Sequence, residues 1–182
     1  MNYHMIRTDD MLNGDGLRVI IFISGCNHRC EGCHNPETWD LNSGMLFDEQ
    51  AKNEIAKELE KDYISGITLS GGDPLKYENL PDVYDLVKFI KDNYPNKTIW
   101  LYTGYKLNYG DFLNADVGWD NGLLRNVIIR NCDVICDGEF IKSLADVNCP
   151  WVGSTNQRVI DVKKTIQENK IVLYREDWVW EC

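Results

Sequence analysis

Apolar residues along this chain form two kinds of pattern, which alternate from residue 18 onward. Over residues 48–62 and 80–93 they recur every three or four positions, which predicts two amphipathic helices. Short continuous runs rich in β-branched residues predict buried strands instead. Four such runs occur, at residues 18–24, 66–70, 98–103 and 133–136. Strands and helices that alternate with short links are typical of a parallel sheet with right-handed crossovers.

Local signals refine this prediction in some places and leave it open in others. Asp48 is placed to cap the first helix, and Pro81 lies near the start of the second. Residues 106–130 give no clear pattern and resemble a loop around residues 115–121. The prediction is therefore firmest for the four strands and the two helices.

The length of the chain limits the architecture. A complete barrel of eight β/α units needs about 250 residues, whereas this chain has 182. We therefore predict an α/β fold that is an incomplete, open (β/α) barrel with a mostly parallel sheet over residues 1–160. Residues 161–182 are predicted to be a C-terminal extension, packed on the barrel or exposed. In this tail, Trp178-Val179-Trp180 has the alternation of an edge strand or a docked segment.

Composition narrows the classes of function. The net charge of −10 disfavours binding to nucleic acid or to anionic lipid. No run of about 18 apolar residues suggests a membrane span, and the first residues lack the apolar stretch of a signal peptide. We therefore expect a cytoplasmic protein, in which cysteines stay reduced and a cluster of them indicates metal or redox chemistry rather than disulfides.

Three of the seven cysteines lie within eight residues, directly after the first predicted strand. Cys26, Cys30 and Cys33 have the spacing C-x3-C-x2-C. Soft thiolates are the ligands that iron–sulfur clusters require. Three of them can hold a four-iron cluster and leave one iron without a protein ligand, which is a place for chemistry.

Zinc is the alternative metal. A structural zinc site takes four ligands, and His28 or His34 would complete a Cys3His set. On spacing alone, this alternative describes a zinc-stabilised interaction module rather than an enzyme.

Further polar or glycine-rich segments follow the other predicted strands. Gly71-Gly72-Asp73-Pro74 follows the second, Thr103-Gly104-Tyr105 the third, and Asp137-Gly138 the fourth. In parallel α/β sheets, ligands bind at the carboxyl ends of the strands. We therefore expect these segments to meet the cysteines at one mouth, where Thr103, Tyr105 and Asp137 either contact a ligand or orient the turns.

The cysteine triplet resembles the cluster motif of the radical S-adenosylmethionine (radical SAM) enzymes, and the Gly71-Gly72-Asp73-Pro74 segment resembles their Gly-Gly-Glu-Pro segment. This resemblance implies a barrel of the radical SAM type. It implies a [4Fe-4S] cluster on Cys26, Cys30 and Cys33, which act catalytically through that cluster, with S-adenosylmethionine on the open iron. It further implies that Gly71, Gly72 and Asp73 bind the methionine amino group and that the backbone of Gly32, Cys33 and His34 contacts the cofactor. Gly32 departs from the family, which usually has an aromatic residue there.

Four further segments are similar to the activating proteins of anaerobic (class III) ribonucleoside-triphosphate reductase. They are residues 13–18, 33–39, 100–105 and 153–158. This narrower resemblance covers roughly residues 1–160. It implies that a deoxyadenosyl radical takes a hydrogen atom from a glycine near the C-terminus of the large reductase subunit. A reduced flavodoxin or ferredoxin-like protein would supply the electron, and no nucleic acid or membrane would take part. Activation of another glycyl radical enzyme, of the formate-lyase type, remains the alternative.

Two remaining features have simpler interpretations. Cys132 and Cys136 repeat the C-x3-C spacing, but four residues along a strand span about 13 Å, too far for one metal. Asn156, Gln157 and Arg158 are expected either to bind the partner's glycine loop or to tie the C-terminal segment to the barrel.

Overall fold

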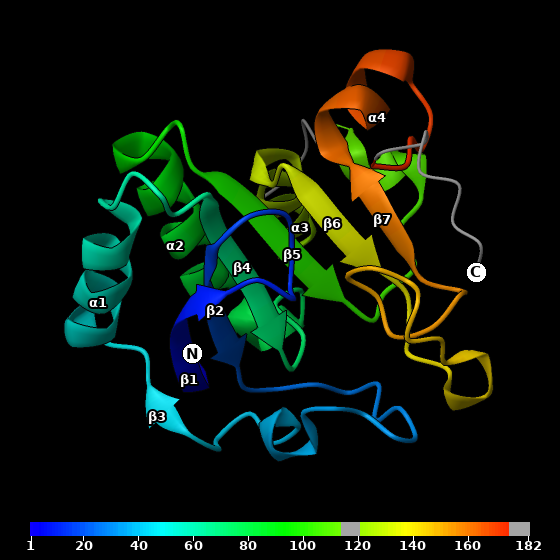
Figure 1. Cartoon of the computed structure of the whole chain (residues 1–182), viewed down its shortest axis with the longest axis horizontal. Helices are drawn as coiled ribbons and strands as arrows, with labels where there is room; N and C mark the ends of the chain where they lie inside the picture. Colours follow the sequence, from blue (N-terminus) through cyan, green and yellow to red (C-terminus); the bar gives the residue numbers. More distant parts are fainter. Residues whose placement is uncertain (114–120, 175–182) are drawn as a thin grey trace.

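The computed structural model describes residues 1–113 and 121–174 and shows an open α/β sheet (Figure 1). Within these residues the sheet has seven strands in the order β3-β1-β2-β4-β5-β6-β7 and does not close. The strands are β1 (Asn2–Asp10), β2 (Arg18–Ile23), β3 (Met45–Leu46), β4 (Gly66–Gly71), β5 (Thr98–Thr103), β6 (Val134–Asp137) and β7 (Arg158–Asp161). Trp178, Trp180 and most of the predicted loop at residues 115–121 lie outside the described residues.

The four predicted strands are confirmed as the parallel centre of the sheet. β2, β4, β5 and β6 pair in parallel, in that order. Every residue of β2 and β6 is buried, as continuous apolar runs require. The antiparallel flanks β1, β3 and β7 were not predicted, so the parallel pattern holds only in the middle of the sheet.

Helices α1 (Glu49–Leu59) and α2 (Leu80–Asn93) confirm the two helical predictions. The Asp48 side chain caps α1 by accepting the Ala51 N–H at 3.0 Å. The predicted end of the first helix, residue 62, was three residues too late. Helix α3 (Asn121–Asn131) was not predicted, and the short helix α4 (Val162–Glu168) lies at the start of the predicted C-terminal extension.

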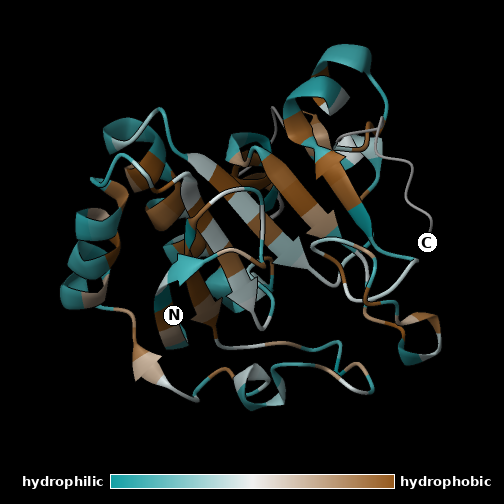
Figure 2. Ribbon diagram, viewed as in Figure 1, coloured by the Kyte–Doolittle hydropathy of each residue, from teal (hydrophilic) through white to brown (hydrophobic). Residues whose placement is uncertain are grey.

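The two faces of the sheet have different covers. In Figure 1 helices α2 and α3 lie behind the central strands and α1 lies to the left of them. The apolar sides of the three helices form one core with Ile21, Leu69 and Leu101. Figure 2 shows the corresponding split, because α1 is hydrophobic toward the sheet and hydrophilic outside. No described helix is long and apolar enough to cross a membrane.

On the opposite face, loops replace helices. Trp100, Val134, Cys136 and Val159 form a second apolar cluster there. The turn before β2 folds over this face, and the Asn13 carbonyl accepts the Thr68 hydroxyl at 2.7 Å. This face and the carboxyl ends of the parallel strands together enclose the site described next.

Beneath the same turn lies Arg18, which is 1% exposed. Its guanidinium donates to the Thr68 hydroxyl at 2.9 Å and to the Ile67 carbonyl at 2.8 Å, and it stacks 5.4 Å from the Trp100 ring centroid. Burial is the main cause that lowers its pKa to about 10. The guanidinium also donates to the Asp15 carbonyl of the turn at 3.0 Å and to the Thr98 carbonyl of β5 at 2.9 Å, so this buried cation holds the turn against β4 and β5.

Candidate metal centre

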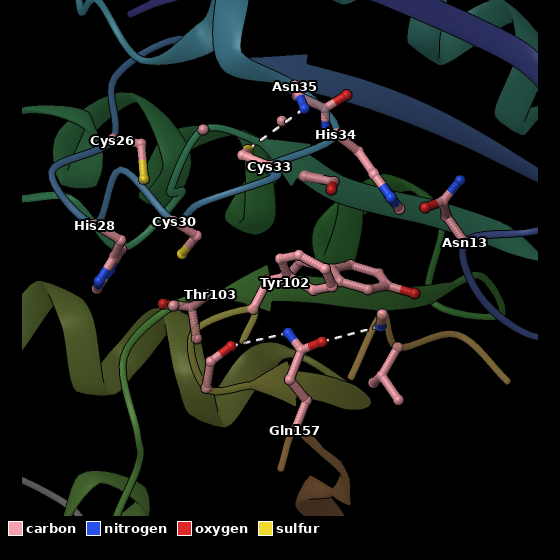
Figure 3. A pocket seen from close by; sticks show the side chains of 18 of the residues that line it. Asn13, Cys26, His28, Cys30, Cys33, His34, Asn35, Tyr102, Thr103 and Gln157 are labelled. Carbon is pink, nitrogen blue, oxygen red and sulfur yellow. Dashed lines mark hydrogen bonds between the residues drawn. The ribbon is translucent and has the colours of Figure 1, made fainter. Parts of the chain in front are cut away.

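The expected meeting of the strand-end segments is confirmed by one pocket (Figure 3). Three cysteines from the loop after β2 line it. The glycines that follow the other parallel strands line it as well. These residues are Cys26, Cys30, Cys33, Gly71, Gly72, Gly104 and Gly138. Thr103, at the end of β5, lines the pocket with them. Segments up to 112 residues apart in the sequence therefore share one cavity because their strands are parallel.

The cysteine loop exposes its thiols partly to this pocket. The Asn35 N–H donates to Cys33 Sγ at 3.4 Å, and the Cys33 N–H donates to the Cys30 carbonyl at 3.1 Å. Burial is the main cause that raises the pKa of the Cys26 and Cys30 thiols. Binding of a metal would therefore displace protons from these two groups.

Gly32 has a backbone reason to be glycine. Its φ of +77° lies in the left-handed region, where a residue with a side chain is strained. A Cβ there would meet only ordinary contacts at 3.5 Å, to Lys142 and Phe140. The turn between Cys30 and Cys33 therefore depends on the backbone conformation of Gly32.

The Gly71-Gly72 turn is hydrogen-bonded to the start of the cysteine loop. The Gly72 N–H donates to the Ile23 carbonyl at 2.7 Å, and the Asp73 N–H donates to the Gly25 carbonyl at 2.8 Å. A Cβ on Gly72 would lie 2.6 Å from the Gly25 oxygen. Only glycine allows the two segments to approach this closely.

Replacing Gly72 by alanine is therefore expected to push the cysteine loop away from the turn. We expect the free energy of unfolding to fall by about 1–3 kcal/mol, the usual cost of overpacking, measured by urea denaturation. Gly110→Ala is the matched control, because a Cβ at Gly110 would meet nothing within 4 Å. Equal stability of the two variants would contradict the close approach.

The Asp73 side chain turns away from the pocket, whereas Gly71 and Gly72 line it. Asp73 is 1% exposed. Its carboxylate accepts the Leu75 N–H at 2.9 Å, the Gly104 N–H at 3.0 Å and the Thr103 hydroxyl at 2.9 Å. These bonds join the turns after β4 and β5, so this carboxylate orients the turns beside the pocket.

His28 bridges two carboxylates. Its Nε2 lies 2.8 Å from Asp73 Oδ2, and its Nδ1 lies 2.8 Å from Glu139 Oε1. The hydrogen bond to Asp73 is the main cause that raises the pKa of His28. Because both ring nitrogens are engaged, His28 is not free to serve as a fourth zinc ligand. His34 lines the pocket, with its ring centroid 5.8 Å from that of Phe140.

Side chains at the start of β7 bond to the loop that follows β6. Arg158 Nε donates to Asp137 Oδ1 at 2.9 Å, and Asp137 is fully buried. Gln157 Nε2 donates to the Gly138 carbonyl, and its Oε1 accepts the Gly153 N–H. Asn156 Nδ2 donates to the Glu139 carbonyl. These contacts favour the expectation that the three side chains hold the C-terminal segment to the barrel over the expectation that they bind the partner.

One further prediction, about Cys132 and Cys136, is tested by the core. Cys132 belongs to the cluster on the helix-covered face, whereas Cys136 belongs to the cluster on the opposite face. The two thiols cannot share one metal, as expected from their spacing.

Several lining residues were not predicted to contact a ligand. Among them are Asn13, Tyr102, Phe140 and Trp151. The sequence signal available for Asn13 was the Asn-Gly-Asp-Gly turn. In the structure its two glycines, Gly14 and Gly16, adopt positive φ.

The residues present fit an iron–sulfur cluster. In the described part of the chain, no three His, Cys, Asp or Glu side chains converge on a point that would hold one metal ion. A single zinc ion needs such convergence. The three thiolates of a cluster bind different irons, so they need not converge on one point; Cys26, Cys30 and Cys33 line one cavity, as ligands of a shared cluster must.

Comparison with protein-family models shows the class of domain to which the chain belongs. The model of the 4Fe-4S single cluster domain matches residues 12–160, which is most of the chain. The anaerobic ribonucleoside-triphosphate reductase-activating protein of Enterobacteria phage T4 is 41% identical over 159 residues, covering 87% of this chain and 93% of its own length. The protein of the same name from Escherichia coli K12 is 42% identical over 161 residues, covering 87% and 97%. That of Vibrio cholerae is 40% identical over 159 residues, covering 86% and 96%.

The chain therefore belongs to the family of anaerobic ribonucleoside-triphosphate reductase-activating proteins.

Proposed function

We propose that this protein is a radical SAM activase of anaerobic ribonucleoside-triphosphate reductase. Cys26, Cys30 and Cys33 each bind one iron of a [4Fe-4S] cluster, and S-adenosylmethionine binds the fourth iron. The observation that carries the proposal is that these cysteines and the Gly71-Gly72 turn line one pocket. The 4Fe-4S family model and the names of the relatives support it.

The proposed reaction is reductive cleavage of S-adenosylmethionine followed by hydrogen transfer. When bound and reduced, the cluster supplies the electron that breaks a sulfur–carbon bond and gives methionine and a 5′-deoxyadenosyl radical. A glycine near the C-terminus of the large reductase subunit gives up a hydrogen atom, leaving 5′-deoxyadenosine and a glycyl radical. A reduced flavodoxin or ferredoxin-like protein is the proposed electron donor.

The chain's own groups position the cofactor in this proposal. Two N–H groups of the Gly71-Gly72-Asp73 turn are already bonded to the cysteine loop. The turn therefore offers carbonyl oxygens, which accept hydrogen bonds from the methionine ammonium. The backbone of Gly32, Cys33 and His34 contacts the other end of the cofactor. Asp73 acts through the turn that it holds, because its carboxylate is bonded to protein donors.

Anaerobic reconstitution with iron and sulfide tests the proposal. The reduced protein is expected to convert S-adenosylmethionine to 5′-deoxyadenosine, detected by chromatography, and to generate a glycyl radical on the purified reductase, detected by electron paramagnetic resonance. Absence of 5′-deoxyadenosine would refute it.

The same experiment decides between the alternatives. A radical on a formate-lyase type enzyme, with none on the reductase, would change the partner. Zinc without iron after strictly anaerobic purification, found by elemental analysis, would support the zinc-stabilised module.

A further inference from the structure

One wall of the cluster pocket has a second hollow beside it. Cys149, Val152 and Gln157 line the cluster pocket, and the same three residues line the second hollow. Leu173 and Tyr174, from the C-terminal extension, line that second hollow as well. The position of this wall therefore depends on the side chains that are packed behind it.

Trp151 lies in this wall and has a strained backbone. It lines the cluster pocket, and its φ is +63°, in the left-handed region that a residue with a side chain adopts at a cost. Backbone hydrogen bonds within the loop are long, at 3.3 Å from Asp146 N–H to the Gly153 carbonyl and 3.4 Å from Cys149 N–H to the Asp146 carbonyl. A strained conformation persists only where the surrounding structure imposes it. Contacts from outside the loop must therefore hold Trp151.

Those contacts are aromatic. The ring centroid of Trp151 lies 5.0 Å from that of Trp100 and 5.8 Å from that of Tyr174. Trp100 and Tyr174 lie 5.3 Å apart, which closes a triangle of edge-to-face pairs. Pairs with this geometry stabilise beyond the apolar area that they bury. Trp100 belongs to β5 and is 1% exposed, so it gives the triangle a fixed base in the sheet.

The backbone of the extension fixes the position of Tyr174. Its N–H donates to the Val159 carbonyl at 2.8 Å, and the Asp161 N–H donates to the Val172 carbonyl at 3.0 Å. Residues 172–174 therefore lie along β7. The Tyr174 hydroxyl adds a bond to Asp15 Oδ2 at 3.1 Å. Because the match of the 4Fe-4S family model ends at residue 160, Tyr174 reaches the pocket wall from beyond the part of the chain that this model covers.

We propose that Tyr174 is a positioning residue for the binding of S-adenosylmethionine. Its ring holds Trp151 in the strained conformation in which Trp151 lines the cofactor pocket. An indole ring packs well against a flat ring such as the purine of the cofactor. Without Tyr174, Trp151 would leave this conformation for part of the time, and the Kd would rise in inverse proportion to the fraction that stays competent. The proposal rests on the proposed function and adds to it a role for the extension.

The test compares Tyr174→Ala and Tyr174→Phe with the wild-type protein, all reconstituted anaerobically. The Kd for S-adenosylmethionine is measured by equilibrium dialysis, and the iron content is measured on the same samples. We expect the Kd to rise about fivefold for Tyr174→Ala, because one edge-to-face pair corresponds to roughly 2–12-fold in an equilibrium constant. Tyr174→Phe keeps the ring and should stay within about twofold of the wild-type protein. The iron content should be the same in all three, since no thiolate is changed.

Tyr109→Ala is the matched control, because the Tyr109 hydroxyl bonds to the same extension, at Asn169 Oδ1 and 2.7 Å, and Tyr109 is not part of the aromatic triangle. A Kd for Tyr174→Ala within twofold of this control would overturn the proposal, since the extension would then stabilise the fold alone. Equal weakening by Tyr174→Phe and Tyr174→Ala would also overturn it, because the hydroxyl and not the ring would be responsible. If Tyr174→Ala fails to fold, Tyr174→Leu, which keeps apolar volume without a ring, decides by the same comparison, with an expected rise of about threefold. Failure of the proposed function looks different, because the wild-type protein itself would then give no 5′-deoxyadenosine.

Discussion

Replacing Cys30 by alanine is expected to remove cluster-dependent activity. Cys30 is the middle ligand of the proposed set and lines the pocket with Cys26 and Cys33. Two thiolates leave a second iron without a protein ligand. Changes to groups that merely support metal ligands cost about 10–100-fold, so loss of a ligand should reduce 5′-deoxyadenosine formation by more than about 100-fold.

The measurement combines iron content, the visible absorbance of the reconstituted protein and the yield of 5′-deoxyadenosine. Cys132→Ala is the matched control, because Cys132 is buried in the helix-covered core away from the pocket. It should keep its iron and its activity and lose only about 1 kcal/mol of stability, as expected for a small core truncation. A Cys30→Ala protein with wild-type iron and product would refute the assignment of the ligands.

The centre of the fold was predictable because its signals are local. Residues of β2 are buried on both faces, so their sequence is a continuous apolar run. The flanks lack this signal. In β1 buried and partly exposed positions are mixed with charged residues, and β3 has only two residues. Their pairing depends on neighbours distant in the sequence, so no short window of sequence contains it.

The candidate site likewise has a part that local sequence predicts and a part that depends on distant neighbours. Cys26, Cys30 and Cys33 were predicted as cluster ligands because metal chemistry limits ligand type and spacing. Asp73 was predicted among the cofactor contacts from the resemblance of its segment to Gly-Gly-Glu-Pro. In the structure its carboxylate is bonded to Thr103 and Gly104, and that contact exists only once β4 and β5 are paired.

The direction of the Asn13 side chain could not be predicted from local sequence either. It belongs to a recognised turn, yet its amide has a direction only because Asp10 lies beneath it. The antiparallel pairing of Asp10 with Arg18 begins β2 directly after this turn. A prediction of the direction of this amide would therefore have needed strand β1, which the apolar pattern did not reveal.

Replacing Asp73 by asparagine is expected to uncouple the turns around the pocket while the cysteines stay in place. The Leu75 N–H bonds to Oδ1 of Asp73, and the Gly104 N–H bonds to Oδ2. An asparagine has one oxygen and one NH2 group, so either orientation sets an NH2 group against a backbone N–H. His28 also loses a charged partner. We expect stability to fall by about 2–4 kcal/mol, the range for a lost charged hydrogen bond and a buried unpaired donor.

Activity should respond differently from iron content. The turn that carries Gly71 and Gly72 is held by Asp73, so formation of 5′-deoxyadenosine should fall about 10–100-fold, as for other groups that orient a metal site. The iron content should stay within about twofold of the wild-type protein, because all three thiolates remain. Asp92→Asn is the control, since Asp92 is 59% exposed and, among the residues that the structure describes, pairs with Lys88 alone; a change within about 0.5 kcal/mol is expected. Asp73→Glu keeps the two acceptor oxygens and should retain more activity than Asp73→Asn. Wild-type activity in Asp73→Asn would show that the turns hold their positions without this carboxylate.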